Sequence, residues 1–512
     1  MQTSIWAIGL RVGSVVTWGI LFASCGGGGS DSGAGSTGAA SNQRGTLVNW
    51  SLAKTLTPNQ YTAGLNSDAN GQLALSVAGP PTCTINIYHI EYWTVAPSPP
   101  GGGTEAPTLV SGAVIVPTGA AVQCSGSRPI LLEAHGFQTD PTYNMADVDP
   151  TTSDIGEREL VPLFFATQGY IVVAPNYAGY DISSLGYWPF LNAEQNAKEM
   201  EDALTAASQA LSGPLASATT DSGKLFTCGY SAGGFVIMAA DKAMQAAGIA
   251  ITATAPTSGV YPVEAWRDAA FTGGLAFSDG MAFLTTSYQN AYGNVYSSLS
   301  DVYTAAYLAD ITSILPSQTV NLLPLAVFNG TPPSTGNPQL DALLQPTTAD
   351  PIIATEFGNP YLITDGYRQS YVTDMIAHPD GAVPQQLPGV PVAAAPQNGL
   401  RQDLALNDMR SWTPRMPMIL CGSDQDHNAP WDVNTAVMAS YWSAQVASGL
   451  VTILDANSAP TSADPYATEK VGYQQYEAQV IATYGLVASY RSVHGVVDYY
   501  CMQAVRDFFA RF

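Results

Sequence analysis

The fold of this 512-residue chain is decided by the stretch Lys224-Leu225-Phe226-Thr227-Cys228-Gly229-Tyr230-Ser231-Ala232-Gly233-Gly234-Phe235-Val236-Ile237-Met238. It begins as an apolar run of strand length, passes through small residues around Ser231, and continues as an apolar segment of helical length. Gly229 and Gly233 flank the serine, where a side chain would collide with the adjoining strand or helix. The pattern predicts a sharp strand-turn-helix unit, a nucleophile elbow, that exposes the hydroxyl of Ser231.

The Gly-x-Ser-x-Gly pattern needs support from its context. In a chain with 48 glycines, such a match arises by chance on the order of a few tenths of a time. The alternative is an ordinary loop rich in Gly and Ser. The order of elements on either side of the stretch has to decide between the two.

That order is one of alternating strands and helices. Two runs, Pro129–Ala134 and Tyr170–Pro175, are short and almost continuously apolar, which is typical of parallel strands covered on both faces. Helical spacing follows at Glu157–Thr167 and Asn192–Leu211. Further strands are predicted at Thr82–Val95, Thr108–Val116, Ala250–Ala255, Pro417–Cys421 and Ala488–Arg491, before a closing helix at Val496–Phe509. The class is therefore α/β, with the mostly parallel, helix-flanked sheet of the α/β-hydrolase fold.

One interval, Tyr261–Trp412, breaks this rhythm. It combines aromatic-rich helical stretches, Ala265–Thr286 and Val295–Leu315, with turns rich in Pro and Gly. It lies between two core strands, so we expect a helical lid or cap inserted over the carboxyl edge of the sheet. The core then consists of residues 46–260 and 413–512.

The N-terminus carries an export signal. Val12–Phe22 is an apolar run of signal-peptide length that ends in Phe22-Ala23-Ser24-Cys25. This resembles a bacterial lipobox, which implies cleavage before Cys25, lipidation of its thiol and attachment to a membrane face. The first basic residue is only Arg11, which leaves an ordinary secretory signal as the alternative. Residues 26–45, rich in Gly, Ser and Ala, are predicted to be a flexible tether.

Composition limits the partners. The chain has 17 Lys and Arg against 40 Asp and Glu, a formal net charge of −23. Such a chain repels phosphate backbones, so nucleic acid is not expected as a partner. The acidity is best explained by solubility, and the composition gives no indication of oligomeric state.

Five cysteines remain beyond Cys25, an odd number for an exported chain. Cys83 and Cys124 flank neighbouring predicted strands and are the candidates for a disulfide. Cys228 and Cys421 lie inside apolar strand runs, and we expect both to be buried as small apolar side chains. No cysteine has the spacing of a metal site.

A reactive serine needs a histidine that accepts its proton. The chain has five histidines, and His494 directly follows the last predicted strand and precedes the closing helix. This fold presents its base at that place, which makes His494 the candidate. The alternative is a surface histidine at the end of a strand.

The carboxylate that orients this histidine is sought in the loop after Pro417–Cys421. Asp424 and Asp426 compete there. Asp426 is preferred because it precedes Pro430 by a spacing common after the acid in this fold, whereas Asp424 suits a turn residue. The order Ser231, Asp426, His494 is that of α/β-hydrolases.

The oxyanion hole is predicted from two backbone N–H groups. One belongs to Ala232, directly after the serine, and the other to Phe137 in His135-Gly136-Phe137-Gln138, the loop after the Pro129–Ala134 strand. Gln138 is the alternative donor. The imidazole of His135 is expected to form hydrogen bonds within the loop.

Together these motifs resemble the secretory lipase family, which includes fungal lipase A-type enzymes and exported bacterial relatives. The resemblance extends over Ile130–Phe512 and includes Val173-Ala174-Pro175-Asn176-Tyr177-Ala178-Gly179-Tyr180, the elbow, and Trp412 with Cys421-Gly422. Asn176 departs from it, since Asp is more usual there. The resemblance implies a serine carboxylic-ester hydrolase with a helical lid. A triad mechanism needs no cofactor, and the aromatic, weakly charged insertion favours an apolar substrate, such as a lipid, an aryl ester or a polyester.

Two other functions stay open. A serine exopeptidase of the same fold would use the same triad and would need carboxylates to bind a substrate ammonium group. The candidates for that role are Glu264, Asp268, Asp279 and Asp301, which otherwise suit a solvated face. A surface-anchored binding protein without catalysis is the third hypothesis, and the completeness of the triad disfavours it.

Overall fold

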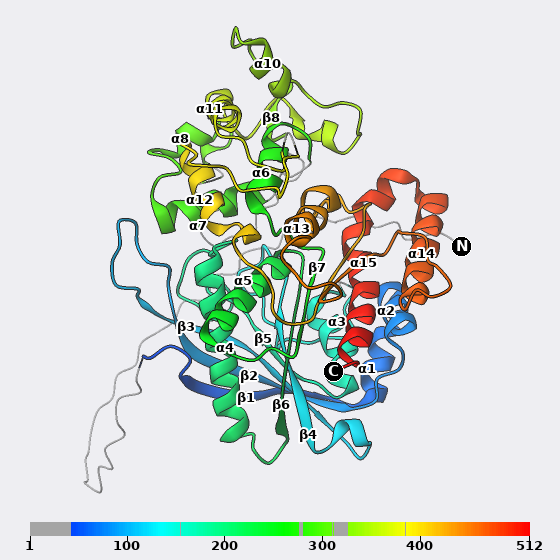
Figure 1. Ribbon diagram of the computed structural model, residues 1–512. Helices are drawn as coiled ribbons and strands as arrows, with labels where there is room; N and C mark the ends of the chain where they lie inside the picture. Colours follow the sequence, from blue (N-terminus) through cyan, green and yellow to red (C-terminus); the bar gives the residue numbers. More distant parts are fainter. Residues whose placement is uncertain (1–41, 154, 276–279, 310, 312–325, 384–385) are drawn as a thin grey trace, which may run out of the picture. The chain divides into compact units, whose positions relative to one another are not determined.

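The computed structural model describes residues 42–512, apart from 154, 276–279, 310, 312–325 and 384–385 (Figure 1). The predicted signal peptide, Cys25 and most of the predicted tether lie outside the described residues. The end of that tether does not: the Arg44 guanidinium lies 3.0 Å from the Asp202 carboxylate, and Gly45 N–H bonds to the Trp93 carbonyl at 2.7 Å. In the part of the chain that is described, no helix has the length and apolar character required to cross a membrane.

A nine-stranded sheet forms the centre of the described residues. Its strands are, in spatial order, β1 (Leu47–Leu56), β2 (Thr84–Val95), β3 (Pro107–Thr118), β5 (Ile171–Pro175), β4 (Ser127–Ala134), β6 (Thr220–Tyr230), β7 (Ala253–Thr257), β10 (Met418–Gly422) and β11 (Val451–Asp455). The pairs from β5 to β11 are all parallel, whereas β1, β2 and β3 pair antiparallel with one another and β3 pairs antiparallel with β5. A mostly parallel sheet was predicted, but neither of its two edge strands, β1 and β11, was.

Helices pack on the sheet in two groups (Figure 1). In one group, α4 (Ala193–Ser212) packs against α5 (Ala232–Ala247), the helix that follows the elbow. In the other, α15 (Leu486–Phe509) contacts α2 (Ala69–Ala78), α3 (Glu157–Phe164) and α14 (Ala467–Tyr484). The remaining helices of the core are α1 (Pro58–Leu65) and α13 (Thr435–Trp442). Strands β5 and β10 are buried along their whole length, which explains their uninterrupted apolar sequence.

The interval between β7 and β10 forms helices that gather at the top of Figure 1. They are α6 (Val263–Phe271), α7 (Gly280–Tyr292), α8 (Leu299–Val302), α10 (Pro338–Leu344), α11 (Asp365–Ala377) and α12 (Gly399–Asn407), with the short strands β8 (Phe328–Asn329) and β9 (Phe357–Gly358). The stretch predicted as one helix at Ala265–Thr286 forms parts of α6 and α7. Of the helix predicted at Val295–Leu315, α8 covers only a part, and residues 310 and 312–315 lie outside the described residues.

Two buried arginines hold this inserted segment together. Arg401 bonds to Asp268 at 2.9 Å and to Glu264 at 3.2 Å, and Arg410 bonds to Asp408 at 2.8 Å. All five side chains are fully buried. The prediction of a solvated face is therefore wrong for Glu264 and Asp268, because the arginines compensate for the loss of hydration of the carboxylates.

The end of the chain differs from the prediction. Ala488–Arg491 is not a strand but part of α15, and the last strand of the sheet is β11, which pairs with β10 from Met418↔Val451 onward. A short apolar run has no period that separates strand from helix, so the sequence was ambiguous there. His494 consequently lies within a helix and not in a loop after a strand.

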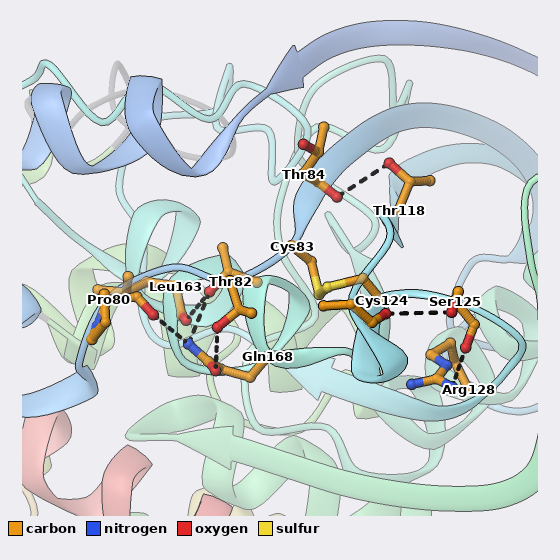
Figure 2. Close-up of a disulfide and its surroundings, with 12 residues drawn as sticks. Pro80, Thr82, Cys83, Thr84, Thr118, Cys124, Ser125, Arg128, Leu163 and Gln168 are labelled. Carbon is orange, nitrogen blue, oxygen red and sulfur yellow. Dashed lines mark hydrogen bonds between the residues drawn. A yellow bond between two sulfur atoms is a disulfide. The ribbon is translucent and has the colours of Figure 1, made fainter.

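Two disulfides are present among the described residues. Cys83 and Cys124 are bonded as predicted, and they join the entry to β2 to the turn before β4 (Figure 2). Cys421 is buried as expected, but it is not a free apolar side chain, because it is bonded to Cys501. Local sequence shows that a cysteine is buried but not which distant cysteine it meets. Cys228 is free and buried, as expected.

Candidate active site

Ser231 lies between β6 and α5 with a backbone that most residues avoid, φ 58° and ψ −124°. Its N–H donates to the Thr257 carbonyl at 3.0 Å. The flanking glycines are sterically required, since a Cβ on Gly233 would lie 1.8 Å from the Ala134 carbonyl oxygen and one on Gly229 would lie 2.3 Å from the carbonyl oxygen of Gly233. Tight packing on both sides thus holds the serine in its strained conformation.

His494 reaches the serine from α15. Its Nε2 lies 2.8 Å from Ser231 Oγ, and its Nδ1 lies 2.7 Å from Asp426 Oδ2. The side chain of His494 is 15% exposed and that of Asp426 is 1% exposed. The structure thus brings together the three side chains that were predicted from the sequence, in the order serine, imidazole, carboxylate.

The Asp426 carboxylate is held from both ends. While Oδ2 faces His494, Oδ1 accepts N–H bonds from Asn428 at 2.9 Å and Ala429 at 3.1 Å. Burial raises the pKa of Asp426, but the nearby His494 and these N–H groups outweigh it and bring the pKa below its ordinary value. Asp424, the competing acid, instead accepts a bond from Asn457 Nδ2 at 2.7 Å.

The His135–Phe137 loop lies beside the elbow. A Cβ on Gly136 would lie 3.3 Å from Ser231 Cβ, so the loop runs directly past the serine. In the described residues the N–H of Phe137 has no hydrogen-bond partner, and Ala232 is the first residue of α5, whose N–H has no partner within the helix. Both N–H groups are therefore available as oxyanion donors. Gln138, the alternative, accepts a bond from Tyr180 Oη at 2.7 Å through its carbonyl.

His135 lies inside the loop among aromatic rings. Its ring stacks on Tyr177 with centroids 4.1 Å apart, and Tyr143 lies 4.9 Å away. Nδ1 lies 2.8 Å from the Gly136 carbonyl oxygen. Burial lowers the pKa of His135 to about 4, so its imidazole is neutral near pH 7. Nε2 also faces a carbonyl oxygen, that of Asn176, but at 3.4 Å. Two acceptors repel more strongly at the shorter distance, which places the single proton on Nδ1, in agreement with the expected bond within the loop.

Aromatic side chains surround Phe137. Its ring lies 4.9 Å from Phe283 on α7 and 5.3 Å from Phe190, both edge to face. Trp188 lies 6.1 Å away. The inserted segment therefore contacts the core directly at the loop that carries the candidate oxyanion donor.

Two side chains of the loop environment were missed by sequence reasoning. Tyr177 Oη donates to the His135 carbonyl at 3.0 Å, and both carboxylate oxygens of Glu157 accept from Gly136 N–H, at 3.0 and 2.8 Å. Glu157 opens a predicted helix, where an acidic residue is ordinary, so the sequence carried no signal for this contact. Within the described residues, no group of three or more His, Cys, Asp or Glu side chains is arranged to hold a metal ion.

Comparison with known proteins defines the class of the fold. Residues 158–273 match the model of the prolyl oligopeptidase family. The rice cell wall degrading esterase LipA from Xanthomonas oryzae is similar in structure, with a TM-score of 0.60 and 22% identity over 86% of this chain and 98% of that chain. A protein from Legionella pneumophila has a TM-score of 0.59 and 17% identity over 91% and 97% of the two chains. No curated protein matches the chain significantly.

These similarities and the sheet topology agree. The chain has the α/β-hydrolase fold, and the fold predicted from the sequence is confirmed. The family match covers α3 from its second residue onward, and it includes β6, the elbow and α5.

Proposed function

We propose that this chain is a serine hydrolase that cleaves carboxylic esters through an acyl-enzyme. The observation that carries the proposal is the pair of contacts of His494, at 2.8 Å from the Ser231 hydroxyl and 2.7 Å from the Asp426 carboxylate. A serine hydroxyl is a poor nucleophile unless a base within hydrogen-bond distance accepts its proton. The strained turn at Ser231 and the free N–H groups beside it support the same proposal.

In the proposed mechanism, Ser231 Oγ attacks the ester carbonyl while His494 Nε2 accepts its proton. Asp426 keeps the Nδ1 proton of His494 in place and stabilises the imidazolium that forms. The oxyanion receives bonds from the N–H groups of Phe137 and Ala232, each worth roughly 3 kcal/mol in the transition state. His494 then protonates the leaving alcohol and later activates the water that releases the acid.

The surroundings of the site favour an apolar acyl or aryl substrate, such as a lipid, an aryl ester or a polyester. Phe190 and Phe283 contact the ring of Phe137, next to the place where the carbonyl would bind. Aromatic side chains at this place suit an uncharged substrate group. We further propose that the inserted segment, residues 261–412, covers the site as a lid.

A serine exopeptidase is the second candidate, and the match to the prolyl oligopeptidase family favours it. The carboxylates required to bind a substrate ammonium group weigh against it. Glu264 and Asp268 are buried and paired with Arg401, and Asp301 accepts the N–H groups of Ser297 and Ser298 at the start of α8. Asp279 lies outside the described residues.

A substrate panel separates the two candidates. Rates on p-nitrophenyl esters of increasing acyl length are compared with rates on aminoacyl-p-nitroanilides, with Ser231→Ala as the control. The proposal expects ester turnover that Ser231→Ala abolishes, and labelling of Ser231 by a fluorophosphonate. Turnover of the anilides alone would reject the esterase and support the peptidase.

We also propose that the protein is exported and anchored through a lipid on Cys25. The two disulfides support an oxidising compartment. Metabolic labelling with a fatty-acid analogue is expected to mark the wild-type protein and not Cys25→Ser. Equal recovery of both proteins in the aqueous phase of a detergent partition would contradict the anchor.

A further inference from the structure

The Gly136–Phe137 peptide carries the proposed oxyanion donor, and a side chain fixes its direction. Its carbonyl accepts the Nδ1 proton of His135 at 2.8 Å. A peptide unit is planar, with its C=O and N–H pointing in opposite directions. The bond to the carbonyl therefore also determines where the N–H of Phe137 points.

The preceding peptide, His135–Gly136, is held at both ends. Its carbonyl accepts from Tyr177 Oη at 3.0 Å, and its N–H donates to both oxygens of Glu157, at 2.8 and 3.0 Å. Since the two peptides share the Cα of Gly136, a rotation of the first one moves the second. Glycine has no Cβ to restrict that rotation, so the side chains supply the restriction.

An acidic residue at the start of a helix can remain in solvent, but the carboxyl group of Glu157 is directed at the loop. Glu157 is the first residue of α3, it is buried, and its carboxyl group lines a small cavity under the elbow together with Glu133, Tyr230 and Asp498. No hydrogen-bond partner is found among the described residues for Glu133 Oε2, Asp498 Oδ1 or Tyr230 Oη. A buried carboxyl group is costly unless it is bonded, and the bond that Glu157 makes is to the loop.

We propose that Glu157 is a positioning residue for acyl transfer. It fixes the His135–Gly136 peptide, so that the next peptide presents the N–H of Phe137 to the developing oxyanion. The inference rests on the proposed function of the site. What the loop requires from residue 157 is an acceptor oxygen at the N–H of Gly136, and a neutral amide oxygen also supplies one.

The test compares two substitutions. Glu157→Leu removes the acceptor, and Glu157→Gln keeps one. With a p-nitrophenyl ester, Glu157→Leu is expected to lower kcat about 100-fold with KM within about threefold, the loss typical of a misplaced oxyanion donor. The kcat of Glu157→Gln is expected to stay within about tenfold of the wild-type value. The affinity for an aryl boronic acid, whose adduct places an oxygen at the oxyanion position, should fall in parallel with kcat.

Glu159 provides the matched control. It lies on the same helix, is buried, and accepts the N–H groups of Asp149 and Gly156, both away from the loop. Glu159→Leu therefore removes comparable bonds, and it is expected to lower stability while kcat per fluorophosphonate-titrated site stays unchanged. If Glu157→Leu does not fold, Tyr177→Phe tests the same peptide by removing the bond at its other end, with an expected fall in kcat of about tenfold.

The outcomes separate the two levels of the argument. An active wild type whose kcat and boronate affinity are unaffected by Glu157→Leu or Tyr177→Phe overturns the positioning role and leaves the proposed function standing. Equal losses of kcat in Glu157→Leu and Glu159→Leu also overturn it, since a general loss of structure explains them. A wild type that hydrolyses no ester and whose Ser231 does not react refutes the proposed function itself.

Discussion

The replacement Asp426→Asn tests the site most sharply, because the structure determines how the new amide must lie. Oδ1 of Asp426 accepts N–H bonds from Asn428 and Ala429. The amide oxygen of Asn has to take that position, since an NH₂ group facing two N–H donors would leave buried donors unpaired at about 1–3 kcal/mol each. The NH₂ group then faces Nδ1 of His494, where the carboxylate oxygen lies 2.7 Å away in the wild type.

The consequence is the wrong tautomer of His494. With NH₂ donating to Nδ1, the imidazole proton must lie on Nε2, which faces the Ser231 hydroxyl at 2.8 Å. The base then cannot accept the serine proton. A wrong tautomer of this kind costs about 10⁴-fold in kcat, about 5 kcal/mol of transition-state stabilisation.

The assay is the initial rate on a short-chain p-nitrophenyl ester, with the rate of fluorophosphonate labelling as a second readout. Asp424→Asn is the matched control, since Asp424 bonds to Asn457 and not to His494, and its rate is expected within about twofold of the wild type. The unfolding midpoint of Asp426→Asn should stay close to that of the wild type, because both loop N–H bonds persist. Loss of activity in Asp424→Asn with retention in Asp426→Asn would refute the reasoning.

Three further predictions concern stability. Gly233→Ala places a Cβ 1.8 Å from the Ala134 carbonyl oxygen and is expected to cost about 3 kcal/mol or more of unfolding free energy in urea titration, whereas Gly366→Ala, with open space around it, should change it by less than about 1 kcal/mol. Burial raises the pKa of Glu157 from 4.5 to about 8, so between these pH values the folded state keeps a proton that the unfolded state loses. The free energy of unfolding of the wild type should therefore fall as the pH rises from 4.5 to about 8. Its dependence on pH should be flatter in Glu157→Gln. The bond between Cys421 and Cys501 closes a loop with a sequence separation of 80, worth about 4–5 kcal/mol in the chain-entropy model. This bond joins β10, which leads into the Asp426 loop, to α15, which carries His494. Replacing both of its cysteines by Ala should therefore lower stability and kcat, whereas the Cys83/Cys124 double variant should lower stability alone; equal kcat in the two variants would contradict this link to the site.

Much of the candidate site was predictable because its side chains lie in short sequence motifs. Ser231 was found from its flanking glycines, and Asp426 from its spacing to Pro430. His494 was chosen for its place near the end of the chain, but for a partly wrong reason, since it lies in α15 and not after a strand. A motif identifies a residue from its neighbours in the sequence. A short apolar run, in contrast, becomes a strand only where another strand of the sheet pairs with it.

What the sequence did not reveal depends on contacts between distant segments. The pairing of Cys421 with Cys501 and the bonds of Glu157 to Gly136 each join residues that no local pattern relates. The edge strand β1 is mostly exposed, so its sequence shows little of the alternation of apolar and polar residues that predicts a strand. The buried pairing of Glu264 and Asp268 with Arg401 was hidden for the same reason, because isolated acidic residues on a helix usually face solvent.

His494, the proposed base, lies on the long helix α15, whose C-terminal end packs in the core. Phe509, at the end of α15, packs against Phe226 near the start of the buried part of β6, with ring centroids 4.6 Å apart. β6 leads from there to Ser231, and α15 leads to His494. Ser231 and His494 are thus carried by two rigid elements that also contact each other through Phe226 and Phe509, away from the site. A substitution that disturbs the packing of Phe226 on Phe509 is therefore expected to change the distance between Ser231 and His494, although it lies far from both.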